Sequence, residues 1–427
     1  MDAETTDPVQ HAAHRNFNLL WSGQSLSLLG NQFLVIGLPL LAVQVVGASA
    51  AQAVLLPFLM FVPFLFFGLP VGAWVDRLPK RKTMILADLV QMVVYASIAL
   101  LSMQGWMTFP LLMVLVFCAG VATVFFQVAY NSFLPELYSR ASELQKGNAK
   151  LFFSESIART LGPMAAGPVI AVFAPPLAIL LNGGSFLVSA LTLGAIRHQR
   201  TDLDRAEVAP VRMSIMSDIK AGLRFVFSHP KLEPVFLCGA VYVLFLTIIE
   251  TSLVLYCKDV LMLSPGTIGL VIGAAAAGFP VANLISSRLM NHFGISRTLV
   301  IAAATSVCGL FLIAVFGAAG SIAGLIAASV LHGLGEGVFG PTSLTLRQTE
   351  TPLALLGRVN SVQRFMIWGA IPMGSVLTSL IITYAGLEWT LWFGGIGTAL
   401  CLLPLVRRGI LADLRAPNQA VNADVTH

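Results

Sequence analysis

Long apolar runs separated by short polar turns dominate the hydrophobic pattern of this chain. Each run has about 20 residues, enough at ~1.5 Å per residue to cross the ~30 Å hydrocarbon core of a bilayer. The runs cover residues 17–46, 53–75, 84–103, 109–131, 149–174, 177–196, 235–257, 267–287, 298–316, 321–343, 359–384 and 389–406. The pattern therefore predicts an all-α membrane protein with twelve transmembrane helices.

The longest polar interruption, residues 197–234, divides the twelve runs into six and six. A weak internal repeat between residues 131–136 and 342–347 favours two six-helix bundles related by pseudo-twofold symmetry, as in many secondary transporters. We expect cytoplasmic tails at 1–16 and 409–427, bundles at 17–198 and 234–408, and a cytoplasmic linker at 199–233. Within the linker, residues 216–229 place Ile219, Leu223, Val226 and Phe227 on one stripe, which predicts an amphipathic helix.

Composition and charge support this class. Apolar residues make up 57% of the chain and charged residues only 11%, against about 25% in soluble domains. The net charge of +5 reflects the positive-inside pattern, because 23 of the 25 Lys and Arg residues lie on one side if the N-terminus is cytoplasmic. We therefore expect a multi-pass protein of the cytoplasmic membrane with both termini inside, no removable signal peptide and no nucleic-acid partner.

Motifs for other chemistry are absent from the sequence. The five cysteines lack metal-like spacing, and no Gly-x-x-x-x-Gly-Lys-Ser/Thr loop or hydrolase motif occurs. We interpret His332, the one histidine within a predicted span, as a core residue. The sequence thus predicts neither an enzyme nor a cofactor or metal site, and leaves an ion gradient as the energy source.

A densely charged turn joins the second and third runs. Arg77, Lys80, Arg81 and Lys82 place four cations in six residues, which are costly to carry through a membrane, so the turn is expected in the cytoplasm. The stretch Gly72-Ala-Trp-Val-Asp76-Arg77-Leu-Pro79-Lys-Arg81-Lys82 resembles the loop 2-3 signature of the major facilitator superfamily, Gly-x-x-x-Asp-Arg-x-Gly-x-Arg-Arg/Lys. Pro79 stands where that family usually has glycine, which alters the turn but retains the charges.

Further stretches resemble the superfamily branch of drug:proton antiporters that contains macrolide efflux proteins and the enterobactin exporter. They lie at residues 18–24, 87–89, 134–137, 158–163, 222–225 and 357–359. The resemblance covers residues 17–408 and implies export of small molecules by alternating access, driven by protons.

The resemblance also implies a conformational gate at the cytoplasmic face. Its candidate residues are Gly72, Asp76, Arg77, Arg81, Lys82, Glu136 and Arg358. A carboxylate such as Asp76 is favoured near a helix N-terminus or a cation, for which Arg358 is a candidate, and Glu136 is a candidate partner of Arg81. The alternative is a basic loop that only sets topology.

Charges inside the spans are costly and usually functional. Glu155 and Arg159 are four residues apart and can pair on one helical face. Asp88 is a candidate partner of the loop cluster or of Arg159. Glu250 and Glu336 lack a helical cation partner three or four residues away, which makes them the better proton carriers.

Two more sets of candidate residues follow. Gly162, Pro163 and Gly167 resemble an antiporter signature of helix 5, although Ala166 replaces a common glycine. The candidates for a substrate cavity are Asn31, Gln32, Gln127, Asn283, Phe126 and Trp368.

A broad apolar cavity with few polar anchors favours amphipathic substrates. The leading hypothesis is a monomeric proton-coupled exporter of drug-like or siderophore-like molecules. The alternatives are a facilitator or lipid flippase on the same fold, or a non-transporting membrane receptor.

Overall fold

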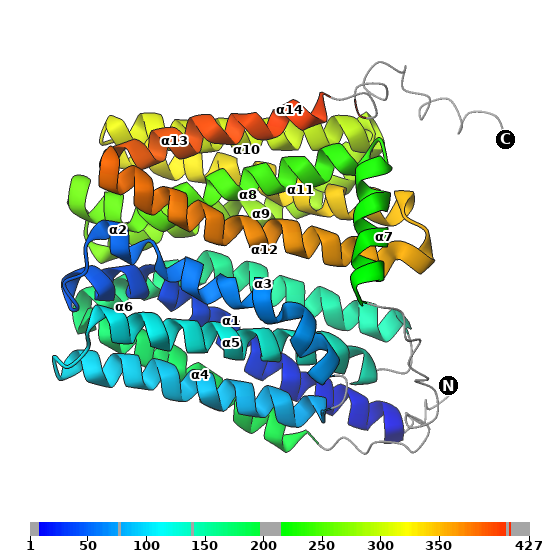
Figure 1. Cartoon of the computed structure of the whole chain (residues 1–427), viewed down its shortest axis with the longest axis horizontal. Coiled ribbons are helices and arrows are strands. Elements are labelled where there is room, and N and C mark those ends of the chain that lie inside the picture. The colour runs from blue at the N-terminus through cyan, green and yellow to red at the C-terminus, as the bar shows by residue number, and fades with distance from the viewer. Residues whose placement is uncertain (1–7, 76–77, 138–140, 197–214, 407–409, 411–427) are drawn as a thin grey trace, which may run out of the picture. The chain divides into compact units, whose positions relative to one another are not determined.

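A computed structural model of the chain describes residues 8–75, 78–137, 141–196, 215–406 and 410 (Figure 1). Regular structure within these residues is helical throughout. The chain divides into two compact units. The first contains residues up to 47 together with 62–212, and the second contains residues 48–61 together with those from 213 onward.

The first unit is built from five helices and one short 3-10 helix. They are α1 (Pro8–Gln44), most of α3 (Leu56–Val75), α4 (Lys80–Met103), α5 (Phe109–Phe133), η1 (Leu134–Leu137) and α6 (Ala141–Ala195). Helix α6 packs along both α1 and α4. The buried core includes Phe17, Leu20, Met84, Val124 and Phe133.

Helix α6 contains two of the predicted spans. They meet at Ala174, which has φ 65° and ψ 162°, outside the helical region. The cause is the Pro175-Pro176 pair, because a proline disfavours helical backbone in the residue before it and brings no amide hydrogen for the helix. The predicted end of the fifth run at residue 174 is therefore confirmed.

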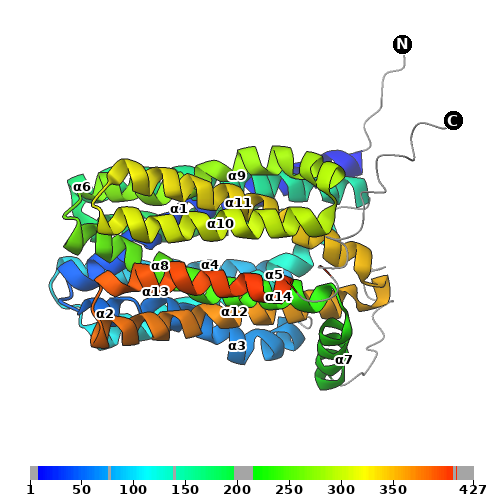
Figure 2. The ribbon, with the colours of Figure 1, turned by 90° about the horizontal axis from the view of Figure 1, so that it is seen from above.

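The second unit contains the short α2 (Ala50–Ala53), the linker helix α7 (Ile215–Ser228) and the remaining long helices. These are α8 (Leu232–Leu255), which continues into the π-helix η3 (Tyr256–Val260), then α9 (Pro265–Phe293), α10 (Ile295–Ala318), α11 (Ile322–Glu350) and α12 (Leu353–Tyr384). The last segment is α13 (Glu388–Thr398), η4 (Ala399–Cys401) and α14 (Leu402–Leu405). Helices α9, α10 and α11 lie side by side (Figure 2).

All twelve predicted runs are helical. Within the described residues, nine helices are long and apolar enough to cross a membrane, or ten if the bent α9 is one span. The difference from twelve has two sources: α6 holds two spans, and the last span is interrupted by the 3-10 turn η4. The twelve-helix architecture expected from the sequence is thus confirmed.

The linker helix α7 lies across the ends of α8 and α12 (Figure 1). Its buried face centres on Gly222 and Val226, with Leu223 and Phe225 packed against the core of the second unit. The stripe predicted from the sequence was wrong at Phe227, which is 44% exposed, and the side chain of Ile219 lies outside the described residues. Phe225 packs against the core instead, so the buried face is rotated relative to the predicted one.

Candidate functional site

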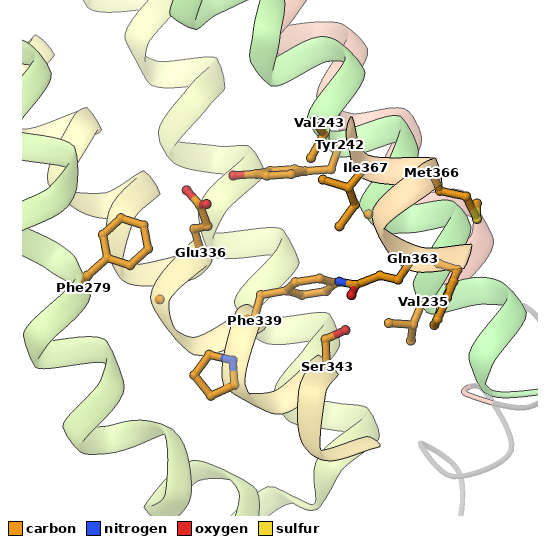
Figure 3. A pocket seen from close by; sticks show the side chains of 15 residues that line it. Val235, Tyr242, Val243, Phe279, Glu336, Phe339, Ser343, Gln363, Met366 and Ile367 are labelled. Atoms are coloured by element: carbon orange, nitrogen blue, oxygen red, sulfur yellow. The ribbon is translucent and has the colours of Figure 1, made fainter. Parts of the chain in front are cut away.

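A cavity of about 280 Å³ lies within the second unit, between helices α8, α9, α11 and α12 (Figure 3). Most of its wall is apolar or aromatic. Its lining includes Val235, Tyr242, Phe279, Glu336, Phe339, Ser343, Gln363, Met366 and Ile367. Among the described lining residues, Glu336 carries the single carboxylate.

Glu336 is the central residue of the 29-residue helix α11 and lies within the predicted span 321–343, about one turn beyond its midpoint. Its side chain is 30% exposed. The Glu336 carboxylate and the Tyr242 phenol point toward the same part of the cavity, with Phe279 on the far side (Figure 3). A carboxylate at this depth is costly unless it binds a partner, which marks it as a functional candidate.

Behind Glu336 lies a network of polar side chains from three helices. His332 Nε2 is 3.4 Å from Glu336 Oε2. On the other side of the ring, His332 Nδ1 is 2.9 Å from Ser306 Oγ and 3.1 Å from the Tyr242 hydroxyl. The two hydroxyls are themselves 2.7 Å apart. The network joins α8, α10 and α11 at the centre of the unit.

Close helix packing makes this network possible. A Cβ atom on Gly335 would overlap the backbone nitrogen of Ser306, and one on Gly309 would overlap the backbone nitrogen of His332. Because both positions lack a side chain, the α10 and α11 backbones approach closely enough for Ser306 to reach the imidazole. The glycine-rich stretch around Glu336 therefore has a packing role that supports the site.

The structure places a helical neighbour beside Glu336, since His332 lies four residues before it on the same face. The sequence-based expectation considered only Lys and Arg as partners of Glu336 and therefore did not include His332. Glu250, the other preferred candidate for proton transfer, is exposed.

In the first unit, the expected pair of Glu155 and Arg159 is present. Arg159 Nη2 donates to Glu155 Oε1 at 3.0 Å, and the side chains of Arg159 and Glu155 are 50% and 38% exposed. Asp88, by contrast, is only 1% exposed. Its hydrogen-bond partner is the Ser189 side chain of α6, while its Oδ2 atom has no hydrogen bond within the described part of the chain.

The candidate gate is described only in part. Asp76 and Arg77 lie outside the described residues, as do the side chain of Glu136 and the surroundings of Gly72. Arg81 donates from Nε to the carbonyl oxygen of Leu193 at 2.7 Å and from Nη2 to that of Gly194. The proposed pairing of Arg81 with Glu136 stays a prediction.

The two remaining gate candidates differ in environment. Lys82 is exposed, whereas Arg358 is half-buried. The backbone of Arg358 lies directly against Gly222 of α7, where an added Cβ would be 3.0 Å from the Arg358 carbonyl oxygen. The linker helix thus packs on the first turns of α12.

The helix 5 signature packs against α1. Gly162, Pro163 and Gly167 are buried, and a Cβ on Gly162 would overlap the Gln32 side chain. Asn31 lies beside Gln32 and is half-buried, with no hydrogen bond to its Oδ1 among the described atoms.

The cavity residues expected from the sequence do not line the described cavity. Phe126 is 6% exposed and packs in the core of the first unit, so its role as a cavity wall stays a prediction. Gln127 and Trp368 are half-buried, and Asn283 has no described side chain. The aromatic walls come instead from Tyr242, Phe279 and Phe339, which nothing distinguishes from the other aromatic residues in the sequence.

Comparison with known sequences identifies a family and several relatives of this chain. A family described as transmembrane secretion effector matches residues 6–423. The chain is 24% identical over 401 residues to macrolide efflux protein A of Streptococcus pyogenes, covering 91% of this chain and 94% of that protein. It is 25% identical over 395 residues to the multidrug efflux pump Tap of Mycolicibacterium fortuitum, covering 90% and 91%.

Solved structures share the fold. A bacterial homologue of the iron transporter ferroportin in its inward-facing state aligns with a TM-score of 0.74 at 17% identity, covering 94% of this chain and 99% of that one. A bacterial homologue of the lysosomal transporter Spinster aligns with a TM-score of 0.67 at 12% identity, covering 97% and 100%. At these identities the likeness concerns the fold alone.

Proposed function

Because this chain belongs to the transmembrane secretion effector family of major facilitator transporters, we propose that it exports amphipathic, drug-like small molecules across the cell membrane in exchange for protons. Alternating access of the two bundles accounts for the movement of substrate. The observation that carries this proposal is the position of Glu336, a single carboxylate at the centre of α11 that lines an apolar cavity.

The chemistry of the cavity supports an amphipathic substrate. Its volume of about 280 Å³ approaches the ~300–1,000 Å³ typical of small-molecule sites. Phe279, Phe339 and Met366 offer apolar surface, while Gln363 and Ser343 offer hydrogen bonds. The efflux activity named for macrolide efflux protein A and for Tap agrees with this substrate class.

Proton exchange follows from the properties of Glu336. A carboxyl group that faces a cavity can be charged in one conformation and protonated in another, so it can carry one proton per cycle. We assign the role of proton carrier to Glu336 in preference to Glu250, Glu155 and Asp88. Among these four residues, Glu336 is the one that lines the described cavity. Cytoplasmic termini and a gate at the Asp76–Arg77 turn complete the proposal.

Proteoliposomes with an imposed pH gradient and an internal pH dye test the proposal. Adding an exported compound, found in a screen of cells that lack their own pumps, is expected to dissipate the gradient. Glu336→Gln is expected to abolish this proton flux. Glu388→Gln, which neutralises an exposed carboxylate in the first turn of α13, is the matched control.

Other outcomes would contradict the proposal in distinguishable ways. Substrate movement without proton movement would indicate a facilitator. Redistribution of labelled lipid between leaflets would indicate a flippase. A proton flux that Glu336→Gln leaves intact would reject Glu336 as the proton carrier.

A further inference from the structure

His332 lies between the cavity carboxylate and two hydroxyl groups from other helices. Its Nδ1 atom faces Ser306 of α10 at 2.9 Å and Tyr242 of α8 at 3.1 Å. Its Nε2 atom faces Glu336, one turn further along α11, at 3.4 Å. His332 is 5% exposed, so its ring nitrogens depend on these groups for hydrogen bonds.

The partners of the ring select one of its two neutral tautomers. A neutral imidazole has one donor nitrogen and one acceptor nitrogen, and an ionised carboxylate only accepts. Ser306 and Tyr242 are hydroxyls that can donate to Nδ1 and to each other. All four groups are therefore satisfied when Tyr242 donates to Ser306, Ser306 donates to Nδ1, and the Nε2 hydrogen points to Glu336.

We propose that His332 is a positioning residue for Glu336. Ser306 and Tyr242 fix His332 as the Nε2-protonated tautomer, and its Nε2–H group holds the ionised carboxylate of Glu336 in place. This inference rests on the proposed function to the extent that Glu336 takes up the transported proton. When Glu336 takes up a proton, its attraction to Nε2–H weakens and the carboxyl group is released toward the cavity.

Within the described residues, the ionisable groups nearest this network lie on the helices packed around α11 and α8. Helix α11 packs against α8, α9 and α10. Glu250 of α8 and Cys401 of η4 are within electrostatic range of Tyr242. His292 lies in the last turn of α9, Arg288 lies one turn before it, and Arg297 lies in the first turn of α10, whereas Glu336 is central in α11. The substitutions that test the inference therefore address the contact between His332 and Glu336.

A matched pair of substitutions separates positioning from packing. His332→Gln places an amide N–H group near the Nε2 position, whereas His332→Asn reaches only the Nδ1 position. Loss of a donor to a carboxylate disfavours its ionised form. We expect the pH at half-maximal proton flux to rise by about one unit in His332→Asn and to change little in His332→Gln.

A second pair on α10 tests the support of the ring. Ser306→Ala removes the group that donates to Nδ1, and it is expected to shift the pH profile in the same direction as His332→Asn. Thr305→Ala is the control, because the Thr305 hydroxyl bonds only its own helix, to the Ile301 carbonyl at 2.8 Å. Equal profiles for His332→Gln and His332→Asn, or for Ser306→Ala and Thr305→Ala, would overturn the inference.

The tautomer of His332 can be measured directly by NMR, without a transport assay. In lipid nanodiscs containing ¹⁵N-histidine protein, the His332 signals are identified by their loss in His332→Gln. Above the half-maximal pH, the ring is expected to carry its hydrogen on Nε2. A hydrogen on Nδ1, or a doubly protonated ring, would reject the inference even if proton-coupled export is found. The expected tautomer in a protein that moves no protons would instead reject the proposed function alone.

Discussion

The guanidinium group of Arg81 donates from Nε to the carbonyl oxygen of Leu193 at 2.7 Å, which joins the first turn of α4 to the last turn of α6. The carbonyl groups at a helix C-terminus lack partners within the helix and carry partial negative charge. Arg81 satisfies two of them, because its Nη2 atom also donates to Gly194. These two hydrogen bonds give Arg81 a structural role, because they stabilise the first unit directly.

Replacing Arg81 should reveal this structural role. We expect Arg81→Gln to lower the stability of the protein by about 1–2 kcal/mol, because two charge-assisted hydrogen bonds to helix-end carbonyls are lost. Loss of the monodisperse peak after heating, followed by fluorescence-detected size exclusion, measures the change. Lys82→Gln is the control, because Lys82 is exposed beside it. Equal melting of the two variants would show that the bonds to Leu193 and Gly194 contribute nothing.

The approach of α10 to α11 gives a second prediction. Gly335→Ala is expected to cost about 3 kcal/mol or to prevent folding, because the new methyl group overlaps the Ser306 backbone. Gly340→Ala lies in the same helix, where an added Cβ meets nothing within 4 Å, and should be tolerated. Yield and melting temperature in the same detergent compare the two. Similar behaviour of both variants would mean that the backbones are not in close contact.

A cluster of charged side chains between the start of α8 and the end of α11 gives a third prediction. Glu350 lies 3.2 Å from Lys231 Nζ and 3.5 Å from His229 Nε2, while His229 Nδ1 accepts hydrogen bonds from the backbone at Lys231 and Leu232. In a double-mutant cycle, Lys231→Gln and Glu350→Gln should show a coupling energy of about 0.5–1 kcal/mol, as expected for partly exposed pairs. The coupling should fall in high salt. Additive effects would exclude a direct interaction.

The linker helix allows a test with adjacent residues. Val226 is fully buried against the second unit, whereas Phe227 is 44% exposed. Val226→Ser should loosen α7 at a cost of about 2 kcal/mol and speed its cleavage by protease, because a buried apolar side chain is replaced by a polar one. Phe227→Ser should leave cleavage unchanged. Faster cleavage in both variants would favour the face predicted from the sequence, which contains Val226 and Phe227 alike.

The architecture was largely predictable from the sequence because its cause is local. A bilayer requires each span to satisfy its own backbone hydrogen bonds, so apolar length alone indicates a helix. The break at Ala174 also follows from the two prolines after it. The face of α7 was less predictable, since both Phe225 and Phe227 fit a helical stripe and only packing against the core separates them.

The candidate site was predictable only where its signal lies within one helix. Glu336 is recognisable because a carboxylate within an apolar span is costly. His332 was interpreted as a core residue, although its spacing of four from Glu336 is a signal that could have identified it as a neighbour of that carboxylate. Ser306 and Tyr242 are 26 and 90 residues from His332, so only the tertiary structure joins them. The chain has 27 phenylalanines, and nothing local shows that Phe279 and Phe339 face the cavity while Phe126 does not.

The contact between Gly335 and the Ser306 backbone has a mechanical consequence. Two helices without intervening side chains can slide past each other with little steric resistance, yet the bond between Ser306 and His332 tolerates only a few tenths of an ångström. A small axial displacement of α10 along α11 would therefore break the chain of hydroxyls that orients the imidazole. The orientation of the Glu336 carboxylate therefore depends on the axial register of α10 and α11. A change in the charge of Glu336 is in turn coupled to movement of these two helices within the second unit.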